Sequence, residues 1–134
     1  MKIICRGCDR GFPLDRFPYR CPDCGDLYSF RDGIKYDSKN IREDKPGIWK
    51  YQNSFSLPDN APVVTLGEGN TPLIWDEVRS KRIGFKLESL NPTGSFKDRG
   101  TSVLVSWLIA AGVNSAVEDS SGNAGSSFAA YATR

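Results

Sequence analysis

The arrangement of the four cysteines is the sequence feature that most constrains the fold. They form two Cys-x₂-Cys pairs, Cys5 with Cys8 and Cys21 with Cys24, separated by twelve residues. This spacing is typical of a zinc ribbon, in which four thiolates surround one metal ion. Four cysteine ligands leave no coordination position open, and the chain contains no histidine. We therefore expect a structural Zn²⁺ site, and iron would suit the same ligands.

Disulfides and reduced free thiols are the two other states open to these cysteines. The N-terminus lacks the apolar run of a signal peptide. A cytosolic setting is therefore expected, and it disfavours disulfides. The Cys-x₂-Cys spacing occurs twice, and this repetition disfavours free thiols. The polar spacer Asp9–Arg20 contains Pro13 and Pro18 and favours a short hairpin. A ribbon this small would take its folding energy from the metal.

Charge and hydropathy exclude two classes of partner. The formal net charge is +2, and a zinc ion on four thiolates would bring it to zero. The arginines of the ribbon are also offset by aspartates. We expect no nucleic-acid partner on this basis. No run of 18 apolar residues occurs, so no transmembrane helix and a cytoplasmic location are expected.

Turn signals and periodicity divide the chain into three predicted regions. Residues 1–30 form the ribbon, 31–62 a linker or covering segment, and 63–134 a partial α/β domain. In the linker, an edge of the next domain could be covered by Ile48, Trp49, Tyr51, Phe55 and Leu57. Core packing is predicted for the aromatic residues among them, with base stacking as the weaker alternative.

The third region has an α/β pattern. Strands are predicted at 63–66, 73–75, 83–88 and 116–118, a helix at 95–111, and a second helix opening in the turn at 120–125. A polar loop before a helix start occurs twice, which suits an anionic ligand such as a phosphate or carboxylate. Neither loop matches G-x-G-x-x-G, which disfavours nucleotide binding.

The stretch Asn91–Gly100 predicts a turn followed by the first of these helices. Ser95 is expected to cap it, paired with Asp98. Lys97 would then lie in the first turn, where the helix dipole disfavours a cation. That environment would lower the pKa of Lys97 and free its amine for covalent chemistry with a carbonyl group. The alternative is an ordinary solvated surface lysine.

One face of this helix is predicted to be buried, because apolar or small residues recur at helical spacing. The residues of that face are Phe96, Gly100, Val103, Leu104, Trp107, Leu108 and Ala111. Gly112 is the predicted stop signal. The chain ends at Arg134 inside the second predicted helix, which suggests the first part of a larger protein.

Three motifs together resemble the threonine synthase family. They are Gly67–Leu73, Asn91–Gly100 and Ser120–Ala124, and the resemblance covers residues 63 to 134. The family consists of pyridoxal-phosphate enzymes of fold type II, the tryptophan synthase β-like fold. The resemblance implies the beginning of a three-layer αβα domain. An N-terminal Cys₄ ribbon is similar to that of some members.

The resemblance also implies residue roles. Lys97 matches the lysine that attaches pyridoxal 5'-phosphate and later moves protons. Asn123 matches the asparagine that hydrogen-bonds the 3-hydroxyl of the cofactor ring. Ser120, Ser121 and Asn123 match the loop that binds the substrate carboxylate. The implied reaction converts O-phospho-L-homoserine, an amino-acid phosphate ester, and water to L-threonine and phosphate. A homodimer is implied for the full-length enzyme.

The sequence departs from the family pattern in one respect. The glycine-rich loop for the cofactor phosphate and the polar residue facing the pyridine nitrogen lie beyond position 134 in the family. We therefore expect an N-terminal fragment that is inactive alone. Cysteate synthase-like and threonine dehydratase-like enzymes are the nearest alternatives. A zinc-ribbon binding module fused to a non-catalytic remnant, with salt-sensitive nucleic-acid binding, is the alternative from another class.

Overall fold

The computed structural model describes residues 2–13, 17–31 and 36–134. Its contacts divide the chain into two units, Met1–Asp37 and Ser38–Arg134. Each unit is described by itself below. No helix among the described residues is long and apolar enough to cross a membrane.

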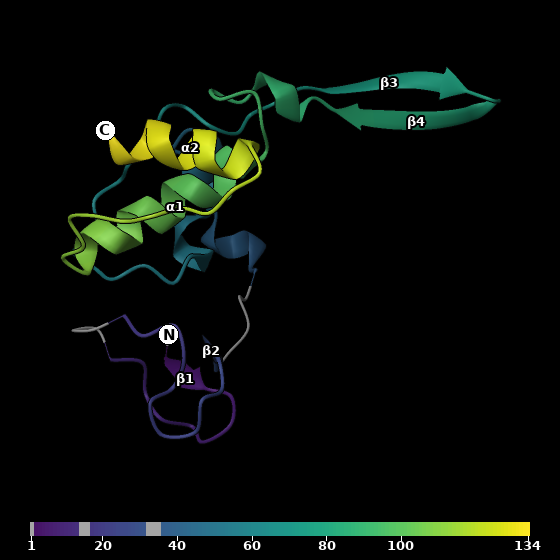
Figure 1. Ribbon diagram of the computed structural model, residues 1–134. Helices are drawn as coiled ribbons and strands as arrows, with labels where there is room; N and C mark the ends of the chain where they lie inside the picture. Colours follow the sequence, from purple (N-terminus) through teal and green to yellow (C-terminus); the bar gives the residue numbers. More distant parts are fainter. Residues whose placement is uncertain (1, 14–16, 32–35) are drawn as a thin grey trace. The chain divides into compact units, whose positions relative to one another are not determined.

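The first unit is built on two short antiparallel strands, β1 (Ile3–Cys5) and β2 (Tyr28–Phe30) (Figure 1). Their register places Cys5 opposite Tyr28. An isolated bridge joins Ile4 to Gly11. The predicted hairpin at residues 9–20 includes positions 14–16, which lie outside the described residues. The two strands hold the first Cys-x₂-Cys turn next to the segment that follows the second.

The second unit contains three 3₁₀ helices, one hairpin and two α-helices. The 3₁₀ helices are η1 (Ser38–Asn40), η2 (Gly47–Ser54) and η3 (Glu88–Leu90). The hairpin consists of β3 (Leu73–Val78) and β4 (Lys81–Lys86). The α-helices are α1 (Lys97–Ala110) and α2 (Asn123–Ala132).

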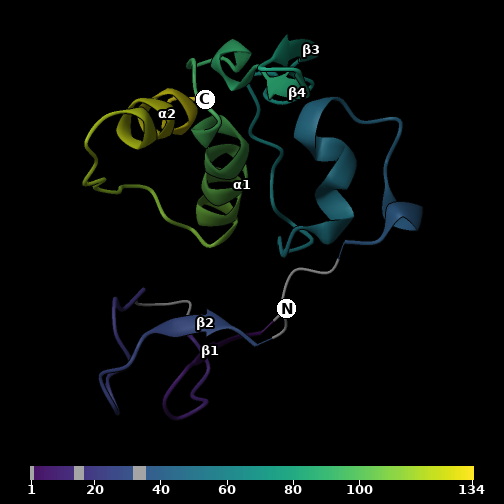
Figure 2. The same ribbon diagram turned by 90° about the vertical axis from the view of Figure 1, so that its right-hand side faces the viewer.

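The helices α1 and α2 pack against one another and form the core of this unit (Figures 1 and 2). The core consists of Val64, Val105 and Tyr131, with Phe128 and Ala130 packed against it. Trp49 of η2 is also buried, so the residues expected in a linker contribute a core side chain. Gly112 has a φ of +78° directly after α1, as the predicted stop signal requires.

The buried face of α1 differs from the predicted one. Phe96 and Leu104 are 56% and 46% exposed. The buried residues of α1 are Asp98, Thr101, Ser102, Val105 and Ser106. These mostly short side chains let α2 approach closely, and their hydroxyls satisfy polar groups: Ser106 Oγ accepts the Val64 N–H at 3.0 Å. Polar pairing therefore decides which face of α1 is buried.

The hairpin β3–β4 overlaps the two strands predicted at 73–75 and 83–88, with shifted ends. Strand β3 extends to Val78, whereas β4 begins at Lys81 and already ends at Lys86. The register of the hairpin runs from Leu73 opposite Lys86 to Val78 opposite Lys81. Arg79 and Ser80 form the turn with φ values of +50° and +59°. Every residue of both strands is exposed. In Figure 1 the hairpin extends away from α1 and α2.

The strands predicted at 63–66 and 116–118 do not form. Val64 lies buried beside α1, and Val117 is 99% exposed. A strand needs a neighbour for its backbone groups, and in the described part of the chain neither segment has one. The described strands form two antiparallel pairs. Helix α2 ends at Ala132, so Arg134 lies past it.

Candidate functional site

The first candidate site is formed by the four cysteines. Their sulfur atoms all lie within 4.8 Å of one another. Cys5 Sγ lies 3.3 Å from Cys24 Sγ, and Cys8 Sγ lies 3.6 Å from Cys21 Sγ. A disulfide would require about 2.05 Å, and all four cysteines are free. Sulfurs bound to one zinc ion at about 2.3 Å in a tetrahedron lie about 3.8 Å apart. The cysteines therefore fit a single tetrahedral metal ion.

Backbone amides contact the Cys5 sulfur and favour the thiolate form of Cys21. The Gly7 N–H points to Cys5 Sγ at 3.4 Å. Burial disfavours the Cys21 thiolate, but the amides of Cys24 and Asp23 outweigh it and lower the pKa of this thiol to about 6. Cys5 and Cys21 are buried, whereas the other two cysteines are exposed. Four cysteine sulfurs form the soft donor set that zinc prefers in structural sites.

The second candidate site is the turn that precedes α1 and carries Lys97. Asp98 is fully buried and folds this turn: its carboxylate accepts the Thr93 N–H at 2.8 Å and the Thr93 hydroxyl at 2.5 Å. Ser95 Oγ accepts the Lys97 N–H at 3.3 Å. The predicted capping pair is therefore wrong in its partners. Ser95 bonds Lys97, and Asp98 bonds Thr93.

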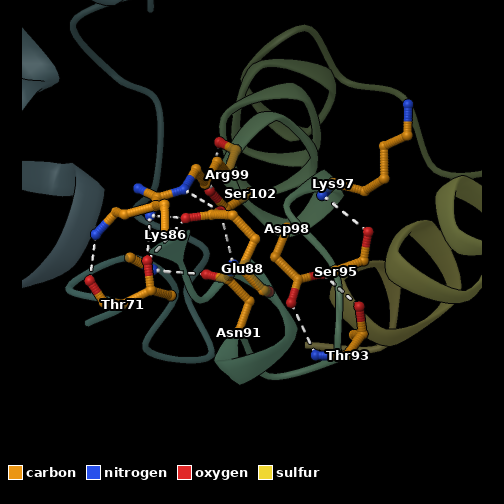
Figure 3. A network of polar contacts seen from close by, with 11 residues as sticks. Thr71, Lys86, Glu88, Asn91, Thr93, Ser95, Lys97, Asp98, Arg99 and Ser102 are labelled. Carbon is orange, nitrogen blue, oxygen red and sulfur yellow. Dashed lines mark hydrogen bonds and ion pairs between the residues drawn. The ribbon is translucent and has the colours of Figure 1, made fainter. Parts of the chain in front are cut away.

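The Lys97 side chain, unlike those of Asp98 and Arg99, has no polar partner in the part of the chain that the structure describes. It is exposed, and its Nζ lies 4.8 Å from the centre of the Phe96 ring. Among the described residues no hydrogen bond or ion pair involves this ammonium. Figure 3 shows the side chain pointing away from the polar network around Glu88 and Arg99. The amine is therefore available for covalent attachment of an aldehyde.

That polar network centres on Glu88, which the sequence pattern did not identify. Arg99 donates to its two carboxylate oxygens from Nε at 2.7 Å and Nη2 at 2.8 Å. Thr71 Oγ1 and Asn91 Nδ2 donate to them at 2.7 and 3.0 Å. Arg99 is the main reason why the pKa of Glu88 is lowered to about 2, against a smaller opposing effect of burial. Asn91 Oδ1 in turn accepts the Gly69 N–H at 3.0 Å.

This network ties the loop at residues 67–72 to the start of α1 (Figure 3). Lys86 adds a hydrogen bond from its ammonium to the Thr71 carbonyl. Glu88 and Arg99 are eleven residues apart, and Thr71 and Arg99 are 28 apart. Spacing along the sequence therefore gave no signal for the pairing.

Glu68 is a second carboxylate that the sequence pattern did not single out, although it lies in the motif Gly67–Leu73. It is 1% exposed. Trp49 Nε1 and the Tyr131 hydroxyl each donate to it at 2.8 Å. Burial would raise the pKa of Glu68, but the backbone amides of Glu68 and Leu66 and nearby hydroxyls outweigh it and lower that pKa. Glu68 thus connects η2, its own loop and α2.

The start of α2 carries the other predicted residues. Asn123 is the first residue of the helix, and Ser120, Ser121 and Asn123 are exposed. Ser120 Oγ accepts the N–H groups of Gly122 at 3.1 Å and Gly125 at 2.9 Å. In the described chain, no hydrogen bond joins Lys97 to these three residues. The Ser120 hydroxyl therefore occupies two amides at the start of α2, the end of a helix that favours anions.

A family model of pyridoxal-phosphate dependent enzymes matches residues 64–134, which contain Lys97 and the start of α2. The chain therefore belongs to the pyridoxal-phosphate dependent enzymes. It is 34% identical to the threonine synthase of Methanocaldococcus jannaschii over 140 residues, which cover 97% of this chain and 34% of the relative.

Two further relatives carry the same name. The chain is 33% identical to the threonine synthase of Methanosarcina acetivorans over 98% of its length and 34% of the relative. It is 46% identical to that of Synechocystis sp. over 65% of this chain and 24% of the relative. The chain thus spans about a third of the length of the first two relatives. Among solved structures, none matches at a significant level.

Proposed function

We propose that these residues are the lysine-bearing part of a threonine synthase, which converts O-phospho-L-homoserine and water to L-threonine and phosphate. The name of the relatives supports the reaction. The observation that carries the proposal is the exposed Lys97 amine at the start of α1, which has no hydrogen bond among the described residues. It lies beside the hydrogen-bonded side chains of Asp98 and Arg99. The chain spans about a third of the length of the first two relatives. The activity is therefore proposed for a whole enzyme of which residues 1–134 form a part.

Lys97 would bind the cofactor aldehyde covalently and then take up and return protons at the reacting carbons. When bound, pyridoxal 5'-phosphate supplies an electron sink. Asp98, adjacent to Lys97, would keep the turn in place through Thr93 and Ser127. The Asn123 amide would hold the 3-hydroxyl of the cofactor ring.

The start of α2 would bind the substrate carboxylate. Ser121 and Asn123 are exposed there, and the amides of Gly122 and Gly125 lie at the positive end of the helix. Rotation of the Ser120 hydroxyl would release both amides to the incoming carboxylate. A carboxylate makes shorter and stronger hydrogen bonds with amides than a hydroxyl does.

The cysteine cluster would hold one structural zinc ion. A Cys₄ site has no open position, so the ion would stabilise the first unit without acting on the substrate. We further propose a homodimer in the cytoplasm, with a small-molecule substrate and no nucleic-acid partner. Size-exclusion chromatography with light scattering tests the dimer.

Covalent labelling tests the role of Lys97. The chain is incubated with pyridoxal 5'-phosphate, reduced with borohydride, and mapped by peptide mass spectrometry. We expect the label at Lys97, because the other described lysines lack a position in the first turn of an α-helix. The Lys97→Ala variant should lose it, whereas Lys81→Ala, at an exposed strand position, should keep it. Label spread evenly over the lysines would contradict the proposal.

A chimera tests the reaction. Residues 1–134 replace the matching part of the M. jannaschii threonine synthase, and phosphate release from O-phospho-L-homoserine is measured. Loss of a positioned proton-transfer group costs about 10²–10⁴-fold in rate, so Lys97→Ala should lose at least that much. Preference for O-phosphoserine would indicate a cysteate synthase-like enzyme. Deamination of L-threonine would indicate a dehydratase-like one.

A further inference from the structure

The hydroxyl group of Tyr28 is buried beside the cysteine cluster without a partner. Its oxygen is shielded from solvent, and no acceptor or donor for it is found among residues 2–13, 17–31 and 36–134. The ring is held in place by Phe12, whose centroid lies 4.9 Å away at an interplanar angle of 90°. A buried hydroxyl without a partner is unfavourable, because folding removes its hydrogen bonds to water without replacing them. Because the ring is fixed and the hydroxyl is buried, this donor needs a hydrogen-bond acceptor close by.

The strand register shows which groups lie near this hydroxyl. Tyr28 is directly opposite Cys5 in the β1–β2 pair, so both side chains stand on the same face. The Cys5 sulfur lies within 4.8 Å of the other three sulfurs. The hydroxyl therefore belongs to the wall of the cysteine cluster, and sulfur is the acceptor type that this wall offers.

Burial narrows the choice to two sulfurs. Cys8 and Cys24 are exposed, so water can hydrogen-bond them, whereas Cys5 and Cys21 are buried. Backbone amides act on both buried sulfurs, that of Gly7 on Cys5 and those of Cys24 and Asp23 on Cys21. Burial is the main factor that raises the pKa of Tyr28, the Cys21 sulfur comes next, and Cys5 contributes less, which favours Cys21 as the acceptor.

We propose that Tyr28 donates a hydrogen bond from its hydroxyl to the Cys21 thiolate when the cluster holds its metal ion. This inference rests on the zinc site proposed above. A thiolate accepts such a bond more strongly than a protonated thiol, because it is charged. The bond would draw electron density from the sulfur and fix its orientation, as partners of metal ligands do. Tyr28 is thus a positioning residue of the metal centre.

Cobalt(II) spectroscopy tests this hydrogen bond directly. The metal-free chain is loaded with Co²⁺, and the thiolate-to-cobalt charge-transfer band is compared between wild type and Tyr28→Phe. Losing the hydrogen bond leaves the sulfur more electron-rich, so we expect the band to move to lower energy. Tyr19→Phe is the matched control, because Tyr19 is 81% exposed, and its band should not move.

Fluorotyrosine at position 28 is the second measurement. Fluorination makes the hydroxyl a stronger donor at almost unchanged ring size, so the band should move to higher energy. The fluorotyrosine measurement tests the hydrogen bond even if Tyr28→Phe prevents folding. An unchanged band in the fluorinated protein would overturn the inference, as would an unchanged band in folded Tyr28→Phe. If wild type shows no thiolate band at all, the metal centre itself is wrong, and the inference falls with it.

Discussion

Asp98 Oδ1 accepts a hydrogen bond from Ser127 Oγ at 2.7 Å, and this contact joins α1 to α2. Asp98 directly follows Lys97, and Ser127 lies one helical turn after Asn123. Both side chains are fully buried. The two helix starts that carry the proposed cofactor-binding residues are therefore held by one charged hydrogen bond in the interior.

Ser127→Ala should destabilise the second unit, because it removes a buried donor from a carboxylate. Hydrogen bonds to charged groups contribute about 1.5–3 kcal/mol. We expect a loss of that size in urea unfolding followed by helical circular dichroism. The matched control is Ser126→Ala at the exposed neighbouring position. Equal stability of the two variants would show that the contact contributes nothing.

Because of Glu88, the stability of the second unit should fall at acid pH. Its pKa is lowered to about 2 in the folded chain, from an ordinary value of 4.5, mainly by Arg99. The contribution of the pair is therefore fully present above about pH 4.5 and is lost as the pH falls towards 2. Urea midpoints measured across this range should fall in wild type and fall less in Glu88→Gln. Glu77→Gln, on the exposed hairpin, should behave like wild type.

Because of Tyr131, the stability of the second unit should also fall at high pH. Burial and the nearby Glu68 carboxylate raise the pKa of Tyr131 above its ordinary value of 10. Stability from the neutral hydroxyl is thus present below pH 10 and is lost as the pH rises further. Tyr131→Phe should cost about 1.5–3 kcal/mol at neutral pH. A double-mutant cycle with Glu68→Gln isolates the pair, and additive effects would contradict the coupling.

Gly47 and Gly69 allow the backbones of η2 and the loop at 67–72 to touch. A Cβ at Gly47 would lie 2.0 Å from the Glu68 carbonyl oxygen, and one at Gly69 would lie 2.8 Å from the Ile48 nitrogen. Both residues have positive φ, so Gly→Ala at either position should destabilise by more than about 1 kcal/mol.

Gly100→Ala provides the contrast for these glycine variants. It lies inside α1, and nothing stands within 4 Å of the added Cβ. Alanine should stabilise the helix by about 0.5–1 kcal/mol. Thermal unfolding measures all three variants together. Destabilisation by Gly100→Ala, or tolerance of alanine at 47 and 69, would contradict the described packing.

Metal removal should unfold the first unit. If zinc supplies its folding energy, a chelator should abolish hydrogen-exchange protection in β1 and β2, and added Zn²⁺ should restore it. Mg²⁺ is the control, because it prefers oxygen ligands and should restore nothing. Native mass spectrometry should show one zinc per chain. Protection that survives the chelator would favour the reduced, metal-free thiols.

Local signals allowed part of this structure to be predicted. The four cysteines come together as their spacing indicated. Helix α1 lies within the predicted range 95–111, because a turn, a polar start and a terminal glycine all act over a few residues. The second helix likewise opens in the predicted turn.

The errors come from contacts that local patterns do not record. The predicted apolar face of α1 assumed that hydrophobic spacing marks the core, whereas Asp98 and Ser106 determine the buried face through their partners. The predicted strand at 63–66 has no described neighbour to pair with. Glu68 and Tyr131 are 63 residues apart, and Glu88 and Arg99 are eleven apart. Spacing along the sequence therefore gave no signal for either carboxylate network.

The exposed hairpin makes tryptophan fluorescence a report on two separate events. Trp75 lies on β3 and is 56% exposed, whereas Trp49 is 2% exposed and bonded to Glu68. A two-stranded hairpin is only marginally stable without further packing. The emission of Trp75 will therefore follow fraying of the β3–β4 hairpin, while that of Trp49 follows loss of the core. A single emission curve would mix these signals, so Trp75→Phe is needed before fluorescence measures the unfolding of the second unit.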